Sequence, residues 1–119
     1  MFKEALQEVV DGTEGAFAAL LMGYDGIPLE QYVREDRPMN VENLGIEYTM
    51  VLKSVMNAAR NLGSGSTNEV AIRAERLTTV IRLLNDEFFL AVALSPNGNS
   101  GKARYLMRVR AGSLREALE

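Results

Sequence analysis

Two uninterrupted apolar segments constrain the fold of this chain more than any other feature of its sequence. Residues 16–22 read Ala-Phe-Ala-Ala-Leu-Leu-Met, and residues 88–94 read Phe-Phe-Leu-Ala-Val-Ala-Leu. Segments of this length suit strands, and a strand that is apolar at every position is buried on both faces. We therefore expect both segments at the centre of one sheet, with helices covering both of its sides.

Turn signals and short connections predict three further strands. Asp25-Gly26 is a strong hairpin signal directly after the first apolar segment, so residues 27–34 should form its partner strand. Pro28 places that strand at a sheet edge, because proline has no N–H to donate to a second neighbour. Residues 69–75 and 77–84 also have strand character, and the short connections at 75–76 and 85–86 predict antiparallel neighbours.

Three helices complete the predicted domain. Residues 2–11, 41–62 and 101 to the end carry apolar side chains at helical spacing, and Asn40 is suited to cap the long second helix. The element order α-β-β-α-β-β-β-α predicts a single α+β domain over residues 1–119. Its five-stranded antiparallel sheet should have the order 2-1-5-4-3. The long helix should cover one side and the two terminal helices the other.

The composition of the chain excludes several classes of function. The 119 residues include no cysteine and no histidine, so thiolate metal sites, cysteine nucleophiles and Ser-His-Asp triads cannot form. The formal net charge of −3 argues against a general nucleic-acid binder. We therefore expect a binding protein that is not an enzyme and uses no metal or other cofactor.

The apolar segments also bear on the compartment of the protein. Each is far shorter than the roughly 20 residues that a membrane-spanning helix needs. The N-terminal residues are acidic from Glu4 onward, unlike a secretory signal. We expect a cytoplasmic protein without membrane insertion.

One segment resembles half of a phosphate-binding loop. Residues 98–102 read Gly-Asn-Ser-Gly-Lys. Pro96 stands where the pattern requires its first glycine, and Ala103 stands where it requires the hydroxyl that binds Mg²⁺. We expect a turn before the last helix here, and a weak anion site at the start of that helix stays open as the alternative.

The long helix has more apolar residues than one contact needs. We expect one stripe to face the sheet, formed by Leu44, Tyr48, Val51, Val55, Ala58 and Leu62. A second surface beside it consists of Gly45, Thr49, Leu52 and Met56. The small side chains at 45 and 49 permit close approach of another helix. This surface is either buried under a larger sheet or covered by a second chain, and we expect a second chain because both other helices lie on the opposite side.

Strand 69–75 indicates the same kind of assembly. It is an edge with the apolar residues Val70 and Ile72, and such an edge favours pairing with another chain. Antiparallel pairing of two copies about Ala71 would place Glu69 opposite Arg73 twice, and opposite charges in such positions are stabilising. We therefore assign Glu69, Ala71 and Arg73, together with the helix surface Gly45, Thr49, Leu52 and Met56, to a dimer interface.

The remaining side of the long helix is a candidate surface for a different partner. Ile46 and Met50 are apolar residues on an otherwise polar face, next to Lys53, Asn57 and Arg60. An apolar centre with charged surroundings is typical of transient protein interfaces. The alternative is that these are scattered surface residues, which need no functional explanation.

The chain resembles the Roadblock family of small-GTPase-regulating and dynein-associated proteins. The most specific match is residues 23–29, Gly-Tyr-Asp-Gly-Ile-Pro-Leu, which is similar to the family's hairpin between its first two strands. Residues 71–73, 80–81 and 89–92 match in order. Residues 101–105, Gly-Lys-Ala-Arg-Tyr, are similar to the bacterial MglB-like branch in particular.

The resemblance implies a function as well as a fold. It implies homodimers, or heterodimers with a Roadblock relative, formed through the third strand and the long helices. It also implies a non-enzymatic platform that binds and regulates a small Ras-like GTPase, stimulating hydrolysis by repositioning switch loops. The residues assigned to that GTPase interface are Ile46, Met50, Lys53, Asn57 and Arg60. Two alternatives stay open: a scaffold dimer without effect on GTP hydrolysis, and a small-molecule sensor, because sheets of this size also host ligand pockets.

Overall fold

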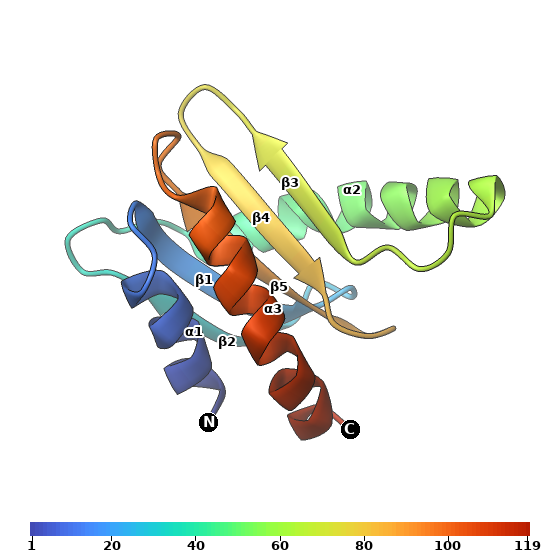
Figure 1. Ribbon diagram of the computed structural model, residues 1–119, viewed down its shortest axis with the longest axis horizontal. Helices are drawn as coiled ribbons and strands as arrows, with labels where there is room; N and C mark the ends of the chain where they lie inside the picture. The colour runs from blue at the N-terminus through green and yellow to red at the C-terminus, as the bar shows by residue number, and fades with distance from the viewer.

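Three helices and five strands follow one another in the predicted order. The computed structural model describes residues 1–119 (Figure 1). The elements are α1 (Phe2–Asp11), β1 (Ala16–Gly23), β2 (Pro28–Val33), α2 (Val41–Leu62), β3 (Glu69–Arg73), β4 (Thr78–Leu83), β5 (Phe88–Leu94) and α3 (Ser100–Ala117). The strands form one antiparallel sheet in the order β2-β1-β5-β4-β3, which confirms the predicted topology. None of the helices combines the length and the apolar character needed to cross a bilayer.

The two apolar segments form the central strands β1 and β5. Every residue of β1 is buried, as is every residue of β5 after Phe88. They pair with each other over most of their length, with Ala19 opposite Val92. β2 lies outside them at the edge, as Pro28 predicted, and the register shifts at Leu21 and Met22 where Pro28 joins the ladder.

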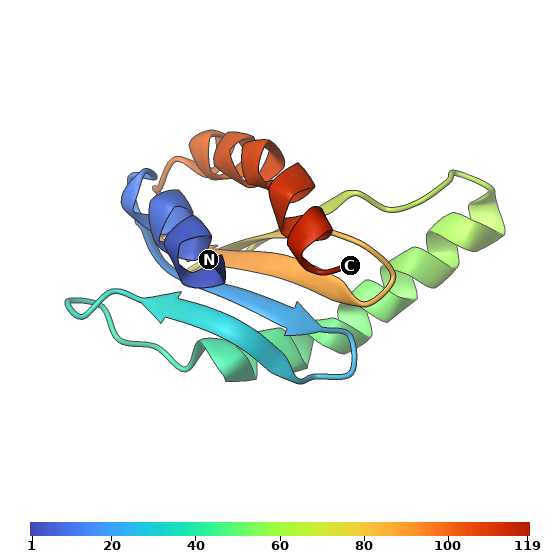
Figure 2. The same ribbon diagram turned by 90° about the horizontal axis from the view of Figure 1, so that it is seen from below.

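Helices cover both faces of the sheet, and each face has its own apolar core. Figure 2 shows α1 and α3 on one side and α2 on the other. On the first side Leu6, Met107 and Leu114 pack on Leu21 and Val92. On the second side Leu44 and Leu52 pack on Leu20, Met22 and Phe89. Alternation along each strand sends neighbouring residues to opposite cores.

The face of α2 that packs on the sheet lies beside the predicted stripe, of which only Leu44 is buried. Val51 is 40% exposed and Leu62 is 81% exposed, whereas Gly45, Thr49 and Leu52 are buried. A Cβ atom at Gly45 would lie 2.4 Å from Cδ2 of Leu20, so the helix backbone rests directly on the sheet at this residue. The prediction weighted the larger side chains, but the closest approach requires the residue without a side chain.

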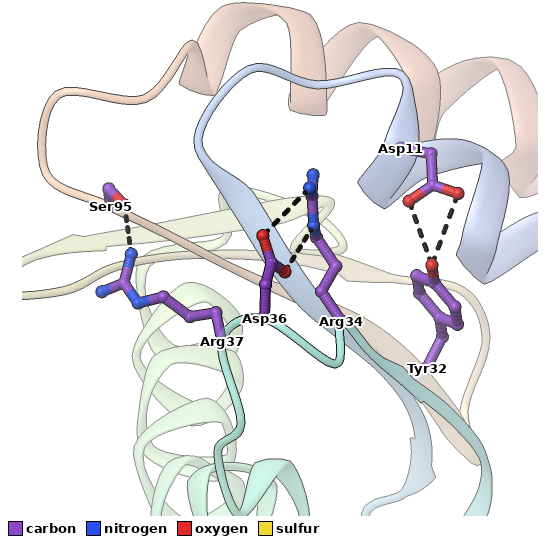
Figure 3. Close-up of polar contacts among 6 residues, drawn as sticks. All are labelled: Asp11, Tyr32, Arg34, Asp36, Arg37 and Ser95. Atoms are coloured by element: carbon purple, nitrogen blue, oxygen red, sulfur yellow. Dashed lines mark hydrogen bonds and ion pairs between the residues drawn. The ribbon is translucent and has the colours of Figure 1, made fainter.

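The loop between β2 and α2 is held by polar contacts (Figure 3). Arg34 pairs with Asp36, with 3.2 Å between Nε and Oδ1. The Arg37 guanidinium lies 4.0 Å from the centroid of the Phe17 ring and donates to Oγ of Ser95 at 2.5 Å. These contacts fix the approach to α2, which begins after Asn40.

A second polar contact joins α1 to the edge strand. The Tyr32 hydroxyl donates to Oδ1 of Asp11 at 3.1 Å (Figure 3). Desolvation of the phenol, followed by the hydrogen bond and the charge of Asp11, raises the pKa of Tyr32. The first helix is therefore tied to β2 by a hydrogen bond as well as by its apolar face.

Candidate protein-interaction surface

The five residues assigned to a partner surface all lie on the exposed side of α2. Met50 is 75% exposed, and Ile46 is also an exposed large apolar residue. Lys53, Asn57 and Arg60 are exposed as well, and Arg60 donates to Oδ1 of Asn57 at 3.3 Å. Helix periodicity of about 100° per residue places these five on one side of α2, away from its buried face. Their predicted exposure is confirmed, and their role as an interface stays a prediction.

The polar members of this set line a groove of about 1180 Å³. Its walls are the C-terminal half of α2, residues 63–68, and the turn between β4 and β5. Lys53, Asn57 and Arg60 line it, and Ile46 and Met50 lie outside its lining. The polar residues Lys53, Asn57 and Arg60 therefore share one groove, and the two apolar residues lie nearer the N-terminal end of α2.

The groove is polar and carries an excess of positive charge. Lys53, Arg60 and Arg115 line it as cations, against the single carboxylate of Asp86. The hydroxyl oxygens of Tyr24 and Thr67, both from lining residues, are buried without a hydrogen-bond partner. An incoming acceptor group would find cations here, while the two hydroxyl oxygens are covered from solvent.

Among the residues that line this groove, Tyr24 has a raised pKa. Its ring packs on Phe89, with 5.5 Å between the ring centroids. Burial, followed by the charge of Asp86, raises the pKa of Tyr24 to about 12. The phenol is therefore a neutral hydrogen-bond donor at physiological pH.

Sequence reasoning missed Tyr24, Thr67, Asp86 and Arg115 as neighbours of α2. Tyr24 belongs to the hairpin segment that carried the family resemblance, so that segment was a usable signal. Arg115 belongs to α3, on the other side of the sheet, and no sequence spacing relates it to α2. Only the chain's path around the β4–β5 turn brings them together.

The chain's own sheet covers most of the predicted helix–helix surface. Gly45, Thr49 and Leu52 are buried against it, and Met56 is half-buried beside them. The assignment of these four residues to a dimer interface stays a prediction. A different flank of α2 is apolar and partly exposed, with Val51, Ala58 and Leu62 exposed and two residues half-buried. We call it the outer flank: Tyr48, Val51, Val55, Ala58 and Leu62. These are residues that had been expected to face the sheet.

β3 is a free edge strand, as predicted, with β4 as its only neighbour. The carbonyl of Asn68 accepts from Leu83, and the N–H of Ala74 donates to Leu77. Residues at even positions therefore bond to β4, so that Glu69, Ala71 and Arg73 direct their backbone groups outward. These are the backbone groups that another strand could pair with.

The charged side chains of β3 have partners on α3 that the sequence did not reveal. The Glu69 carboxylate accepts from Nε of Arg104 at 2.7 Å, and Arg73 donates to Oγ of Ser100 at 2.9 Å. Both contacts link the edge strand to the helix that covers it. Pairing of Glu69 with Arg73 across two chains stays a prediction, and any such pair would form beside these existing contacts.

Comparisons with known proteins place the fold and the family. Sequence models of known families give no match, and neither do curated proteins. Among solved structures, the chain is 36% identical to MglC from Myxococcus xanthus, with 98% of each chain covered and a TM-score of 0.71. A Roadblock/LC7 domain from Streptomyces avermitilis has 16% identity, 97% and 95% coverage, and a TM-score of 0.85. The gliding protein MglB from Thermus thermophilus has 20% identity, 96% and 85% coverage, and a TM-score of 0.85. The two latter likenesses show the fold, and the identity to MglC over nearly the whole of both chains shows that this chain belongs to the Roadblock/LC7 family, among its MglB- and MglC-like members.

Proposed function

We propose that this protein is a dimeric Roadblock-type regulator that binds a small Ras-like GTPase through the exposed side of α2. The observation that carries the proposal is the exposure of Ile46 and Met50 beside Lys53 and Arg60, on a helix whose adjacent face is anchored in the core. Membership of the family supplies the class of partner. In this proposal the protein supplies no catalytic group and changes the activity of the GTPase by binding to it.

The chemistry of this surface suits an acidic switch region. Two exposed apolar side chains supply area that a partner can desolvate, and the two cations beside them favour carboxylates and disfavour a basic partner. Arg60 is held toward Asn57 within its own helix, which favours a binding role over insertion into a nucleotide site. We therefore infer that any stimulation of hydrolysis proceeds through switch positioning.

The proposed dimer uses β3 and the outer flank of α2. Pairing about Ala71 would let the outward N–H and C=O groups of two copies bond to each other. It would bring Glu69 of one copy opposite Arg73 of the other, next to the contact with Arg104. Val51 and Leu62 would lose their exposure to water against the second chain, at roughly 25 cal/mol per Å² of apolar area buried.

The GTPase site is tested by the double variant Met50→Asp, Lys53→Glu. We expect it to remain a dimer and to lose a GTP-loaded Ras-like GTPase from the same genome in a pull-down. A matched control is the pair Val109→Asp, Arg108→Glu, which makes the same kinds of change on α3. Full GTPase binding by the first variant, or equal loss in both, would show that the exposed side of α2 is not the site.

Hydrolysis measurements separate a regulator from a scaffold. We expect wild-type protein to accelerate GTP hydrolysis by the bound GTPase, and Arg60→Ala to preserve that acceleration. Binding without acceleration would favour the scaffold dimer, and loss of acceleration in Arg60→Ala would favour an arginine finger. The groove gives little support to a small-molecule sensor, since only 4 of its 15 lining residues are hydrophobic.

The dimer is tested by two neighbouring residues on different sides of α2. Val51→Asp places a charge on the outer flank, and Met50→Asp places the same charge on the proposed GTPase side. We expect light scattering to give a reduced mass for the first variant and an unchanged dimer mass for the second. Equal masses for the two variants, or a monomeric wild type at micromolar concentration, would contradict the proposed arrangement.

A further inference from the structure

A second charged surface lies on the opposite side of the molecule from α2. Figures 1 and 2 show α3 over the sheet face that α2 does not cover. The helix carries five cations and one anion, in a chain whose net charge is −3. The charged residues of α3 are Lys102, Arg104, Arg108, Arg110, Arg115 and Glu116. Positive charge is therefore concentrated on α3.

The arginines on this side are aligned along α3 and the two strands next to it. Arg104, Arg108 and Arg115 are separated by four and seven residues, which brings them to one side of the helix at about 100° per residue. The contact of Arg104 with Glu69 on β3 shows that this side faces β3. Arg82 of β4 is the register partner of Glu69 and shares the sheet face of Val80, which packs in the α3 core.

We call three of these arginines the arginine face: Arg82, Arg104 and Arg108. Arg73 belongs to the proposed dimer strand, and Arg115 lines the groove beside α2. The members of the arginine face have little compensation within the chain. Glu69 forms the one ion pair, with Arg104. Nε of Arg82 is buried without a hydrogen-bond partner. By contrast, Arg110 on the other side of α3 is paired with Glu8.

Two apolar side chains are exposed beside these charges. Tyr105 and Val109 lie one turn apart on α3 and are 51% and 56% exposed. The guanidinium carbon of Arg108 lies 5.7 Å from the centroid of the Tyr105 ring. Tyrosine and arginine are the residue types that contribute most at protein interfaces, because they combine apolar area with hydrogen bonding.

We propose that the arginine face binds an acidic segment of a partner protein, with carboxylates on the arginines and an apolar side chain against Tyr105 and Val109. Arginine binds a carboxylate through two parallel N–H···O bonds, and Arg108 is exposed on this face for such a contact. A short segment meets only the local positive field. An extended polyanion, such as DNA or an anionic bilayer, would also meet the rest of a net negative chain.

The proposal is independent of the GTPase site and is tested with a defined probe. The probe is a fluorescein-labelled peptide of glutamates interrupted by leucines, and a peptide with glutamines in place of the glutamates is its control. In low-salt buffer we expect fluorescence anisotropy to report saturable binding of the acidic peptide only. We expect Arg108→Glu to weaken it about tenfold or more, since one charge-assisted contact is lost and a repulsion added. Lys3→Glu, a charge reversal beside β2 at the other edge of the sheet, should leave it unchanged.

Each alternative outcome overturns the proposal. Equal affinity of Arg108→Glu and wild type, or equal weakening by Lys3→Glu, would place the peptide elsewhere. Tighter binding of a DNA duplex or of phosphatidylserine vesicles than of the peptide, measured in the same buffer, would identify a different occupant. Amide shifts in NMR spectra confined to α2 would do the same, whereas shifts along α3 and β3 are expected. Unchanged spectra elsewhere show that each variant is folded.

Discussion

Replacing Gly45 with alanine should destabilise the protein, although alanine is the better helix former. The residue lies within α2, where a Gly→Ala change is worth about 1 kcal/mol in helix propensity. Against this, the new Cβ would lie 2.4 Å from Cδ2 of Leu20 and 2.7 Å from Sδ of Met22. Both of these side chains are fully buried, so neither can move into solvent to make room.

The gain in helix propensity and the cost of the new contact can be compared through their typical free energies. Overpacking a buried contact costs roughly 1–3 kcal/mol. We therefore expect a net loss of about 1 kcal/mol for Gly45→Ala, after the gain in propensity is subtracted. Gly112 provides a matched control because it also lies inside a helix, and a Cβ there would meet no atom within 4 Å. Gly112→Ala should stabilise the protein by about 0.5–1 kcal/mol.

Urea unfolding at one fixed protein concentration measures both variants against wild type, because association would otherwise shift the midpoint. The two substitutions should move the midpoint in opposite directions. Thermal unfolding should separate them by several degrees, at about 4 °C per kcal/mol. An increase in stability for Gly45→Ala as large as that for Gly112→Ala would refute the direct contact of this helix with β1.

Three further predictions concern single side chains. Leu52→Ala should lower the free energy of unfolding by about 2–5 kcal/mol in urea unfolding, because Leu52 is in the core. Val51→Ala should stay within about 1 kcal/mol of wild type in the same assay, because Val51 is outside the core. Asn40→Ala should cost about 1 kcal/mol in the same assay, because its Oδ1 accepts from the N–H of Asn43 at 3.0 Å; Asn61→Ala, within the helix, should cost less. Tyr24 should ionise near pH 12 in a titration followed by tyrosinate absorbance, and Tyr24→Phe should remove that phase. Its raised pKa contributes stability that is complete below about pH 10 and is lost as the pH rises through about 12.

The sequence predicts the sheet of this protein better than it predicts the faces of its longest helix. The central strands are apolar at every position, and the Asp25-Gly26 turn and Pro28 fix the neighbour and the edge, so few topologies are compatible. Along α2, apolar residues occur on more than half of the circumference. Periodicity alone then cannot distinguish the buried face, and the residue in closest contact, Gly45, contributes nothing to a hydropathy pattern.

The candidate surfaces were predictable only where they lie on one element. The exposed set on α2 could be found from helical spacing, because all five residues share one helix. The groove beside it combines residues from the β1–β2 turn, the segment after α2, and α3. The arginine face likewise depends on the register of β3 with β4 and on the placement of α3 over them. Such groupings arise from tertiary contacts, which leave no local signal in the sequence.

The unequal anchoring of α2 has a consequence for its local stability. Its closest backbone approaches are to β1 and β2, and its C-terminal end projects past the sheet in both views (Figures 1 and 2). Helical segments shorter than about 12–15 residues are marginal in water without packing. The last turns are closed by the Gly63 cap, through the bond of Ser64 N–H to the Ala59 carbonyl at 3.0 Å. Backbone amides in these turns should therefore exchange with deuterium by local opening, well before global unfolding. A second chain that docks on the outer flank would suppress that opening. Part of the free energy of binding would then be used to order the helix. The exchange rates of these amides would therefore fall as the protein concentration rises.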